Sequence, residues 1–493
     1  MLYTNSEIKE PRNETPHFLY NLTPETSRWH GRLEKTSEYF SEYSTMKNRI
    51  IVDIAWLKHL IKYKLVITSD RKIKKLKPEE SIILDKLQED FSLENAKEIW
   101  QLDLLINHDT MAVERYLQAK LKNTNLKDVI NYIPIGLTAT DVDNIAFNIS
   151  LKAFIETSYM PMINTLILNL YKLILKEKDT FMLGRTHGVP ALTTTAGKEL
   201  ASFGITLKQH VEELKTIPMS AKACGEVGTR AELIAIAQTL NINVNWEKVS
   251  DDFIKSFGFI PQKYVTQSES HENQIKIFNN ISQTARLLQK LSKDLWMYNA
   301  LGYITWSDSQ ERVGSSGMPH KINPIGTEFS EWHSYYGEKQ LEAIIGMIMQ
   351  SRLQRALVDK YALRHVGPAL ANILLAIEEM SDVLIRVKFR REILKKELDN
   401  HWEILSSLLQ CMLRIQGDEN PYDKIKKISR GLTWSKEDYI KAVKELPLNK
   451  QIKKKLYEFS PEKYSGESVK LTMDALRELK GYINSNNKYF TTQ

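Results

Sequence analysis

One loop-like stretch of the 493-residue chain predicts the structure around it: Gly314-Ser315-Ser316-Gly317-Met318-Pro319-His320-Lys321-Ile322-Asn323-Pro324. Gly314 and Gly317 permit backbone angles that other residues resist, so we expect a mobile loop. Asn323 and Pro324 are typical of the cap and the first position of a helix. After them, apolar residues recur at helical spacing, namely Ile325, Phe329, Trp332 and Tyr336. The stretch therefore places two hydroxyls, a cation and an amide before a helix N-terminus, where an anion is favoured.

The composition predicts an all-α protein with a large core. The chain is 42% hydrophobic and 26% charged, and it contains only 20 Gly and 15 Pro. Leu, Lys, Glu and Ile are plentiful, which favours helices over sandwiches or barrels. We expect three helical domains: an N-terminal domain over 1–128, a central long-helix domain with the loop over 129–384, and a C-terminal domain over 385–493.

Charge and cysteine content narrow the partners and the compartment. The net charge of +7 suits an anionic small molecule and does not demand a nucleic acid, so no nucleic-acid partner is expected. Two cysteines exclude a disulfide framework and favour a reducing compartment. The polar segment 1–18 is not typical of a signal peptide, and the most apolar helix, 160–175, is interrupted by polar residues. We therefore expect a cytoplasmic protein without a membrane segment.

Several further motifs have both a structural and a functional interpretation. Asn107-His108-Asp109 opens a predicted helix, and the Thr and Asp residues of 136–144 are typical helix caps. The segment 184–191 places His187 between glycines and a proline, which predicts a sharp turn. In 351–365 four cations occur close together, as on a solvated helix face or around an anion.

The motif G-S-S-x-M-P-x-K-x-N-P resembles the signature loop of the fumarase/aspartase superfamily, whose members eliminate fumarate from a succinyl group. His320 after Pro319 makes it most similar to the adenylosuccinate lyase family. The segments 136–144 and 184–191 resemble that superfamily's first and second signature regions, and the similarity extends roughly over 29–480. It implies a central helix bundle of the fumarase/aspartase type, a homotetramer with active sites shared between subunits, and no metal or organic cofactor.

The resemblance also implies roles for individual residues in a β-elimination. Ser315 would be the base and His187 the acid that protonates the departing nitrogen. Lys321 would stabilise the charged intermediate, and Glu328 would orient the histidine. The substrate-binding residues implied are Arg32, Asn107, His108, Asp109, Thr138, Thr186, Gln267, Ser316, Asn323, Arg355, Lys360 and Arg364.

Four departures from the family pattern leave the substrate open, all on the substrate-holding side: Leu33, Ala139, Lys360 and Tyr361. The first hypothesis is cleavage of adenylosuccinate to AMP and fumarate, with the related imidazole-carboxamide step from SAICAR to AICAR. The second is a sister lyase acting on another succinylated amine. The third is a catalytically silent protein that uses a lyase scaffold for binding, against which the joint presence of base, acid and stabilising residues argues.

Overall fold

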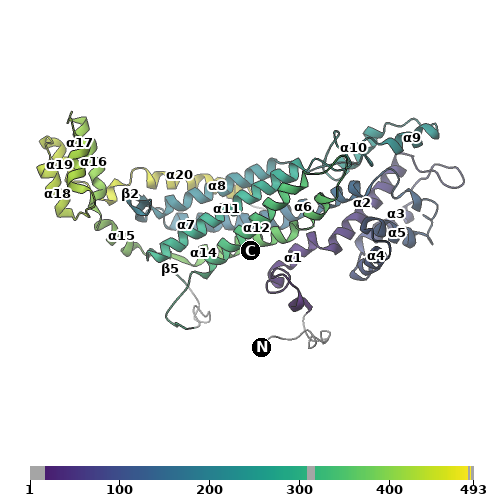
Figure 1. Ribbon diagram of the computed structural model, residues 1–493, viewed down its shortest axis with the longest axis horizontal. Coiled ribbons are helices and arrows are strands. Elements are labelled where there is room, and N and C mark those ends of the chain that lie inside the picture. The colour runs from purple at the N-terminus through teal and green to yellow at the C-terminus, as the bar shows by residue number, and fades with distance from the viewer. Residues whose placement is uncertain (1–16, 308–316, 487–488, 490–493) are drawn as a thin grey trace. The chain divides into compact units, whose positions relative to one another are not determined.

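The computed structural model describes residues 17–307, 317–486 and 489, which fold mainly into helices (Figure 1). Strands in this part of the chain are confined to three two-stranded sheets. The prediction of an all-α fold is therefore confirmed. Ser315 and Ser316, the predicted base and its neighbour, lie outside the described residues.

The chain divides into two compact units, each assembled from three separate stretches. Unit 1 combines Met1–Pro161, Glu212–Ala285 and His333–Leu375, and unit 2 combines Met162–Val211, Arg286–Trp332 and Ala376–Gln493. The boundaries between the units fall within long helices, so each of these helices contributes residues to both units. They are α7 (Met160–Lys176), α8 (Ala196–Thr216), α11 (Glu272–Ala300), α12 (Ile325–Ile348) and α14 (Val366–Arg386). The three domains with boundaries near 128 and 384 stay a prediction.

Unit 1 is built from short and medium helices around one apolar core. Its elements are α1 (His30–Phe40), α2 (Glu42–Lys62), α3 (Pro78–Glu89), α4 (Leu93–Ile106), α5 (Asp109–Leu121), α6 (Ala139–Phe154), β3 (Ser220–Ala221), α9 (Ala231–Thr239), α10 (Trp246–Ser256), β4 (Ile260–Pro261) and α13 (Val358–Leu363). The stripe on α2 faces this core, with Ile50, Ile54 and Leu57 fully buried. Asn48 of α2 donates to Ser150 Oγ of α6 at 2.8 Å, so a polar contact adds to the apolar packing of these two helices.

Local capping fixes where two helices of unit 1 begin. Thr138 caps α6: its hydroxyl accepts from the Thr140 amide at 3.2 Å, and Asp141 accepts from the Thr138 amide at 2.9 Å. His108 caps α5, because its Nδ1 accepts from the Met111 amide at 3.1 Å. Both helix starts were predicted from the sequence, and the cap predicted for the α6 segment is confirmed.

Unit 2 contains a group of long helices and a smaller helical region. Beyond the shared helices, its elements are β1 (Phe181–Thr186), β2 (Val189–Thr195), β5 (Ile304–Trp306), β6 (Val387–Phe389), α15 (Arg391–Asp399), α16 (Ser406–Ile415), α17 (Pro421–Ser429), α18 (Lys436–Glu445), α19 (Lys450–Leu456) and α20 (Ser468–Ser485). The long helices lie side by side (Figure 1), and polar contacts join them. Asn169 of α7 donates to Ser381 Oγ of α14 at 2.7 Å, and Tyr482 of α20 donates to Asn164 of α7 at 2.6 Å.

The sharp turn predicted around His187 is confirmed. Strands β1 and β2 pair antiparallel, and the two residues between them, His187 and Gly188, have φ values of 55° and 78°. Two consecutive positive φ values are typical of the tightest hairpin turns. The turn presents the exposed imidazole at the end of a hairpin.

The helix predicted after the loop forms one residue later than expected. It was predicted to start at Pro324 with Asn323 as its cap, but α12 starts at Ile325. The Pro324 carbonyl accepts the first backbone bonds, from the Thr327 amide at 3.0 Å and the Glu328 amide at 3.4 Å. Pro324 therefore occupies the cap position itself.

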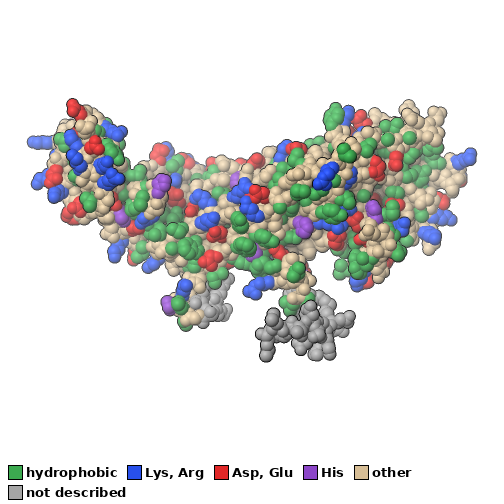
Figure 2. Space-filling model, in the orientation of Figure 1, with side chains coloured by type: hydrophobic (Ala, Val, Ile, Leu, Met, Phe, Trp, Pro, Cys, Tyr) green, Lys and Arg blue, Asp and Glu red, His purple; other side chains and the backbone are tan. Residues whose placement is uncertain are grey.

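Basic and acidic side chains are interspersed on the face of the molecule that Figure 2 shows. Among residues 17–307 and 317–486, no helix combines the length and the apolar character needed to cross a membrane.

Candidate functional site

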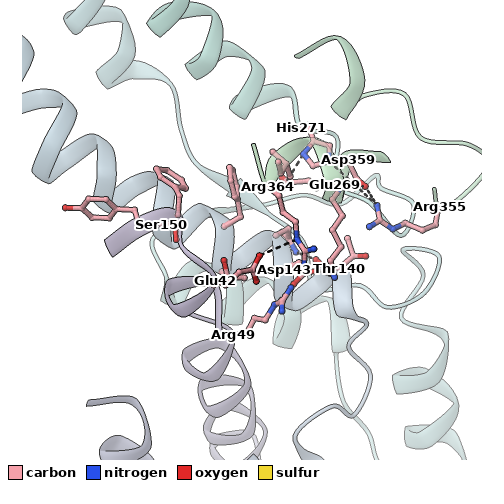
Figure 3. A pocket seen from close by; sticks show the side chains of 18 residues that line it. Glu42, Arg49, Thr140, Asp143, Ser150, Glu269, His271, Arg355, Asp359 and Arg364 are labelled. Carbon is pink, nitrogen blue, oxygen red and sulfur yellow. Dashed lines mark hydrogen bonds and ion pairs between the residues drawn. The ribbon is translucent and has the colours of Figure 1, made fainter. Parts of the chain in front are cut away.

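A pocket in unit 1 collects several of the predicted substrate-binding residues (Figure 3). Its walls come from α1, α2 and α6, from the loop that precedes α11, and from the segment around α13. The charged and hydroxyl-bearing residues that line it are Tyr39, Glu42, Thr45, Arg49, Thr140, Asp143, Ser150, Glu269, His271, Arg355, Asp359, Lys360 and Arg364.

Three cations of this pocket converge on one carboxylate, that of Asp109. Arg49 Nη2 lies 2.9 Å from Asp109 Oδ2, Lys360 Nζ lies 2.8 Å from Oδ1, and Arg364 Nη2 lies 2.8 Å from Oδ2. The tripeptide motif at the start of α5 and the cationic segment around α13 are thus brought together across the fold. Burial alone would raise the pKa of Asp109, but Arg49 and Lys360 outweigh it and hold the pKa below its ordinary value.

A second carboxylate, Asp143 on α6, holds two of these three cations, Arg49 and Lys360. It accepts from Arg49 Nε at 2.7 Å and lies 3.2 Å from Lys360 Nζ. Arg49 is 2% exposed, so its charge needs these partners. Burial disfavours the charged guanidinium, yet Asp143 and Asp109 raise the pKa of Arg49 above its ordinary value. Arg49 is therefore a fixed cation in the pocket wall.

The two cations nearer the solvent can exchange a partner for a ligand. The Arg364 side chain is 45% exposed and meets Glu42 from the solvent side at 3.8 Å. Lys360 holds two carboxylates at once, as a point charge without a fixed direction of approach. An anionic ligand group could take the place of Asp109 at these two cations while Arg49 keeps Asp143.

The loop 262–271 and the segment that carries Arg355 are joined by several bonds. The Gln267 amide donates to the Gln354 carbonyl at 3.2 Å, and Arg355 Nη1 donates to Ser268 Oγ at 2.8 Å. The Gln267 side chain donates to Glu226, which lies in the glycine turn after β3. In that turn Gly228 has a φ of +76°, and a Cβ there would lie 2.2 Å from the Val265 carbonyl oxygen. A glycine is therefore required for the loop that carries Gln267 to pack closely.

The other predicted residues of unit 1 lie outside the pocket lining. Asn107 ends α4 in the left-handed conformation, and the exposed His108 uses Nδ1 as the cap of α5. Thr138 uses its hydroxyl in the cap of α6, and its neighbour Thr140 lines the pocket instead. Arg32 is exposed on α1.

Unit 2 holds the predicted residues of the elimination step that the structure describes. Thr186 and His187 are exposed at the tip of the β1–β2 hairpin, and Lys321 is exposed before α12. Glu328 in the first turn of α12 accepts from Trp296 Nε1 at 3.1 Å. Among the described residues, His187 and Glu328 make no hydrogen bond or ion pair with each other. Their roles stay predictions.

The sequence interpretation did not select four groups that the pocket uses: Arg49, Asp143, His271 and Asp359. Arg49 directly precedes the apolar stripe of α2, and this position was a signal of its role, because a buried cation requires a carboxylate partner. Asp143 lies within the signature region and Asp359 beside Lys360, so proximity to recognised motifs was a signal for both. Among the described residues no group of three or more His, Cys, Asp or Glu side chains is placed to hold a metal ion.

Similarity to known proteins extends over most of the chain. A family described as "Lyase" matches residues 27–334, and one described as "Adenylosuccinate lyase C-terminal" matches residues 351–465. Adenylosuccinate lyase of Buchnera aphidicola subsp. Baizongia pistaciae is 32% identical over 92% of this chain and 96% of its own length. The enzymes of the same name from Legionella pneumophila strain Philadelphia 1 and Escherichia coli K12 are 31% and 28% identical, each over 92% of this chain and 98% and 97% of their own lengths.

Solved structures show the same fold at lower identity. A fumarate lyase from Mesorhizobium sp. BNC1 has a TM-score of 0.72 at 15% identity, covering 90% of this chain and 97% of its own. The 3-carboxy-cis,cis-muconate lactonizing enzyme from Pseudomonas putida has a TM-score of 0.71 at 15% identity, covering 91% and 97%. At this identity the likeness concerns the fold alone.

Proposed function

Because the chain belongs to the adenylosuccinate lyase family, we propose that it cleaves adenylosuccinate to AMP and fumarate, and SAICAR to AICAR and fumarate. The observation that carries the proposal is the cation cluster of unit 1, within a chain that is similar to these enzymes over 92% of its length. Lys360 and Arg364 offer two positive charges to the anionic groups of a succinylated nucleotide. Asp109 and Asp143 hold these cations in place before the ligand binds.

The reaction we propose is a β-elimination with a base and an acid on opposite sides of the succinyl group. Ser315 removes the proton on the carbon next to a carboxylate, and the electron pair spreads onto that carboxylate. The C–N bond then breaks, fumarate leaves, and His187 delivers a proton to the departing nitrogen. An imidazole suits this step, because it titrates near neutral pH.

The groups around the loop stabilise the charge that develops. Lys321 and Asn323 hold the dianionic carboxylate of the intermediate, an effect worth about 3–4 kcal/mol for each well-placed donor. Lys321 and the amides at the start of α12 also stabilise the Ser315 alkoxide, since a serine is too weak a base without such help. Glu328 fixes the orientation of His187. Arg32, Arg355, Lys360 and Arg364 receive the anionic parts of the nucleotide.

We further propose that the active form is a homotetramer in which neighbouring subunits complete each site. Large apolar side chains lie exposed on α11 and α12 in unit 2, which supports self-association: Trp296, Met297, Ile325 and Trp332. The ligand-binding residues of unit 1 and the elimination residues of unit 2 would then meet across subunit boundaries. Mixing an inactive Ser315→Ala protein with an inactive His187→Ala protein tests this, because only shared sites can regain activity in mixed tetramers.

A second candidate is a lyase of the same family that acts on another N-succinyl amine. Leu33, Ala139, Lys360 and Tyr361 depart from the family pattern on the substrate-holding side. Lys360 in particular makes two ion pairs where the family has a serine. A changed substrate would require such changes and leave the elimination residues intact.

One assay separates the two candidates. The purified protein is incubated with adenylosuccinate, SAICAR and other succinylated amines, and fumarate is measured together with the loss of succinyl-purine absorbance. Turnover of adenylosuccinate supports the first candidate, and fumarate from another amine alone supports the second. His187→Ala purified in the same way is the control, because it reveals any lyase carried over from the expression host.

A further inference from the structure

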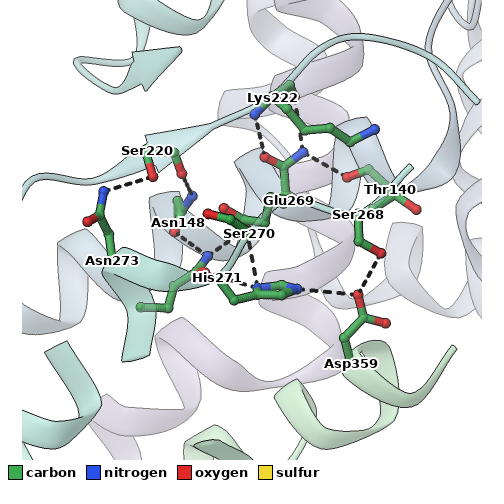
Figure 4. A network of polar contacts seen from close by, with 12 residues as sticks. Thr140, Asn148, Ser220, Lys222, Ser268, Glu269, Ser270, His271, Asn273 and Asp359 are labelled. Carbon is green, nitrogen blue, oxygen red and sulfur yellow. Dashed lines mark hydrogen bonds and ion pairs between the residues drawn. The ribbon is translucent and has the colours of Figure 1, made fainter. Parts of the chain in front are cut away.

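His271 occupies a buried position in the pocket that the proposed reaction does not use. It lies between the loop that carries Gln267 and the first turn of α11, is 3% exposed, and lines the same pocket as Lys360. Its backbone has a φ of +56°, which is uncommon for a residue other than glycine. The position of the imidazole is set by polar neighbours on three different segments (Figure 4).

The hydrogen-bond network fixes the proton on Nδ1 of His271. Asn148 Nδ2 donates to the Ser220 carbonyl at 2.8 Å, so Asn148 Oδ1 must be the atom that faces Gln274 Nε2, at 3.1 Å. Gln274 Nε2 also donates to Glu269 Oε1 at 2.6 Å. Gln274 Oε1 is then the atom that faces His271 Nδ1, at 3.0 Å. Because an amide oxygen can only accept, Nδ1 carries a hydrogen.

The second ring nitrogen faces a carboxylate. His271 Nε2 lies 3.3 Å from Asp359 Oδ2. Asp359 is ionised, because Arg355 Nη1 lies 2.5 Å from its Oδ1 and forms an ion pair with it. An ionised carboxylate is an acceptor, so Nε2 carries a hydrogen as well. Both ring nitrogens therefore face acceptors, an arrangement that only the doubly protonated imidazolium satisfies in full.

The charges around the ring agree with this state. The carboxylates of Glu269 and Asp359 face it, with Glu269 Oε1 at 3.7 Å from Nδ1. Arg355 forms an ion pair with Asp359, and the charge of Lys222 acts to lower the pKa of Glu269. Burial lowers the pKa of His271, but Asp359 and Glu269 outweigh it and raise the pKa above its ordinary value. Burial also raises the pKa of Glu269, so Asp359 is the carboxylate that chiefly neutralises the positive charge of the protonated ring.

Asp359 connects this ring to the cations of the pocket. Its Oδ1 accepts from Arg355 Nη1 at 2.5 Å and from the Lys360 amide at 2.7 Å. Its Oδ2 accepts from Ser268 Oγ at 3.2 Å as well as from the ring. We propose that His271 is a positioning residue: as an imidazolium it couples the Gln267 loop to the Arg355–Arg364 segment through Asp359, and substrate affinity falls when its proton is lost. The inference rests on the proposed function for its effect on substrate, but the charged state of the ring does not.

Loss of one proton would leave one of the two acceptors facing a lone pair. A raised pKa in the folded protein means that the coupling is complete below the ordinary value of about 6.5 and is lost as the pH rises through the higher folded value. We therefore expect the KM of the wild-type enzyme to rise about tenfold across this titration, the size expected for one charge-assisted hydrogen bond. The kcat should follow the groups of the elimination step and not this titration.

The test compares KM and kcat between pH 6 and 9.5 for the wild type, His271→Gln and His401→Gln. The control, His401, also contacts a carboxylate, with its Nδ1 2.6 Å from Glu403 Oε1, but lies in the small helical region of unit 2. His271→Gln should have a raised KM that no longer changes with pH in this range, while His401→Gln keeps the wild-type profile. A His271→Gln enzyme that retains the wild-type rise in KM would overturn the proposal.

Two further measurements keep the test decisive. Asp359→Asn should remove the same pH dependence of KM, so this single variant tests the proposal even if His271→Gln fails to fold. In the double variant, the rise in KM should be smaller than the sum of the two single rises. The melting temperature of the wild type should exceed that of His271→Gln at pH 6, by a margin that shrinks as the pH rises. If no succinylated amine is turned over, the proposed function fails, but this margin still decides whether the ring is charged. A margin that is independent of pH contradicts the charged ring even in an active enzyme.

Discussion

Replacing Asp109 with Asn would test the ion cluster that organises the pocket. The Asp109 carboxylate holds three cations at 2.8–2.9 Å, and one of them, Arg49, has a side chain that is only 3% exposed. Losing the partner of a buried charge costs about 3–5 kcal/mol when no other partner remains. Here Asp143 still holds Arg49, and the half-exposed Arg364 contributes little. We therefore expect a loss at the lower limit of that range, a fall of about 3 kcal/mol in the free energy of unfolding.

If unit 1 unfolds cooperatively, a loss of about 3 kcal/mol corresponds to a decrease of about 5 °C in its melting temperature. Scanning calorimetry at a fixed protein concentration would measure it, with Asp128→Asn as the control, since Asp128 is exposed and makes no ion pair among the described residues. The pKa of Asp109 is lowered in the folded protein, so its contribution is complete above its ordinary pKa of about 3.9 and is lost as the pH falls through the folded value. The difference between the two proteins should persist at neutral pH and narrow only in strong acid. Equal melting temperatures for Asp109→Asn and the wild type at pH 7 would refute the stabilising role of the cluster.

Three further substitutions test other parts of the site. Lys360→Met should raise the KM for a nucleotide substrate by about 10- to 100-fold with a smaller change in kcat, while the exposed Lys436→Met leaves both unchanged; a loss confined to kcat would contradict its binding role. Gly228→Ala should lower the melting temperature and weaken substrate binding, because its Cβ would lie 2.2 Å from the Val265 carbonyl oxygen in the Gln267 loop. A circular-dichroism melt that matches the wild type would show that the loop adapts. Thr138→Ala should cost about 1 kcal/mol of stability through the lost helix cap, and Thr138→Ser should retain it; a Ser variant as unstable as Ala would refute the capping explanation.

Features that depend on neighbouring residues were predictable from the sequence. Thr138 is followed by Asp141 at the spacing of a capping box, so the start of α6 needed no knowledge of the fold. The turn at His187 was predictable because glycine and proline flank it, although the two strands that it joins were not. Pro324 was misplaced by one residue, since its fixed φ suits the cap position as well as the first helical position.

Features that depend on packing between distant segments were not predictable. Asp109 and Lys360 are 251 residues apart, and neither sequence neighbourhood indicates their ion pair. The division of the chain into two units, each assembled from three separate stretches, also could not be read from composition. Arg49 lies beside a buried stripe, but only the folded arrangement shows that Asp109 and Asp143 are its partners.

The most direct test of the proposed reaction is the rate of fumarate release from adenylosuccinate by the wild type and by His187→Ala. The wild type should release AMP and fumarate in equal amounts, and His187→Ala should be slower by at least ~10²-fold while folding normally, because a general acid contributes an effect of this size. Fumarate release at the same rate from both proteins would remove the imidazole from the mechanism, and no release from either would contradict the assignment of this substrate.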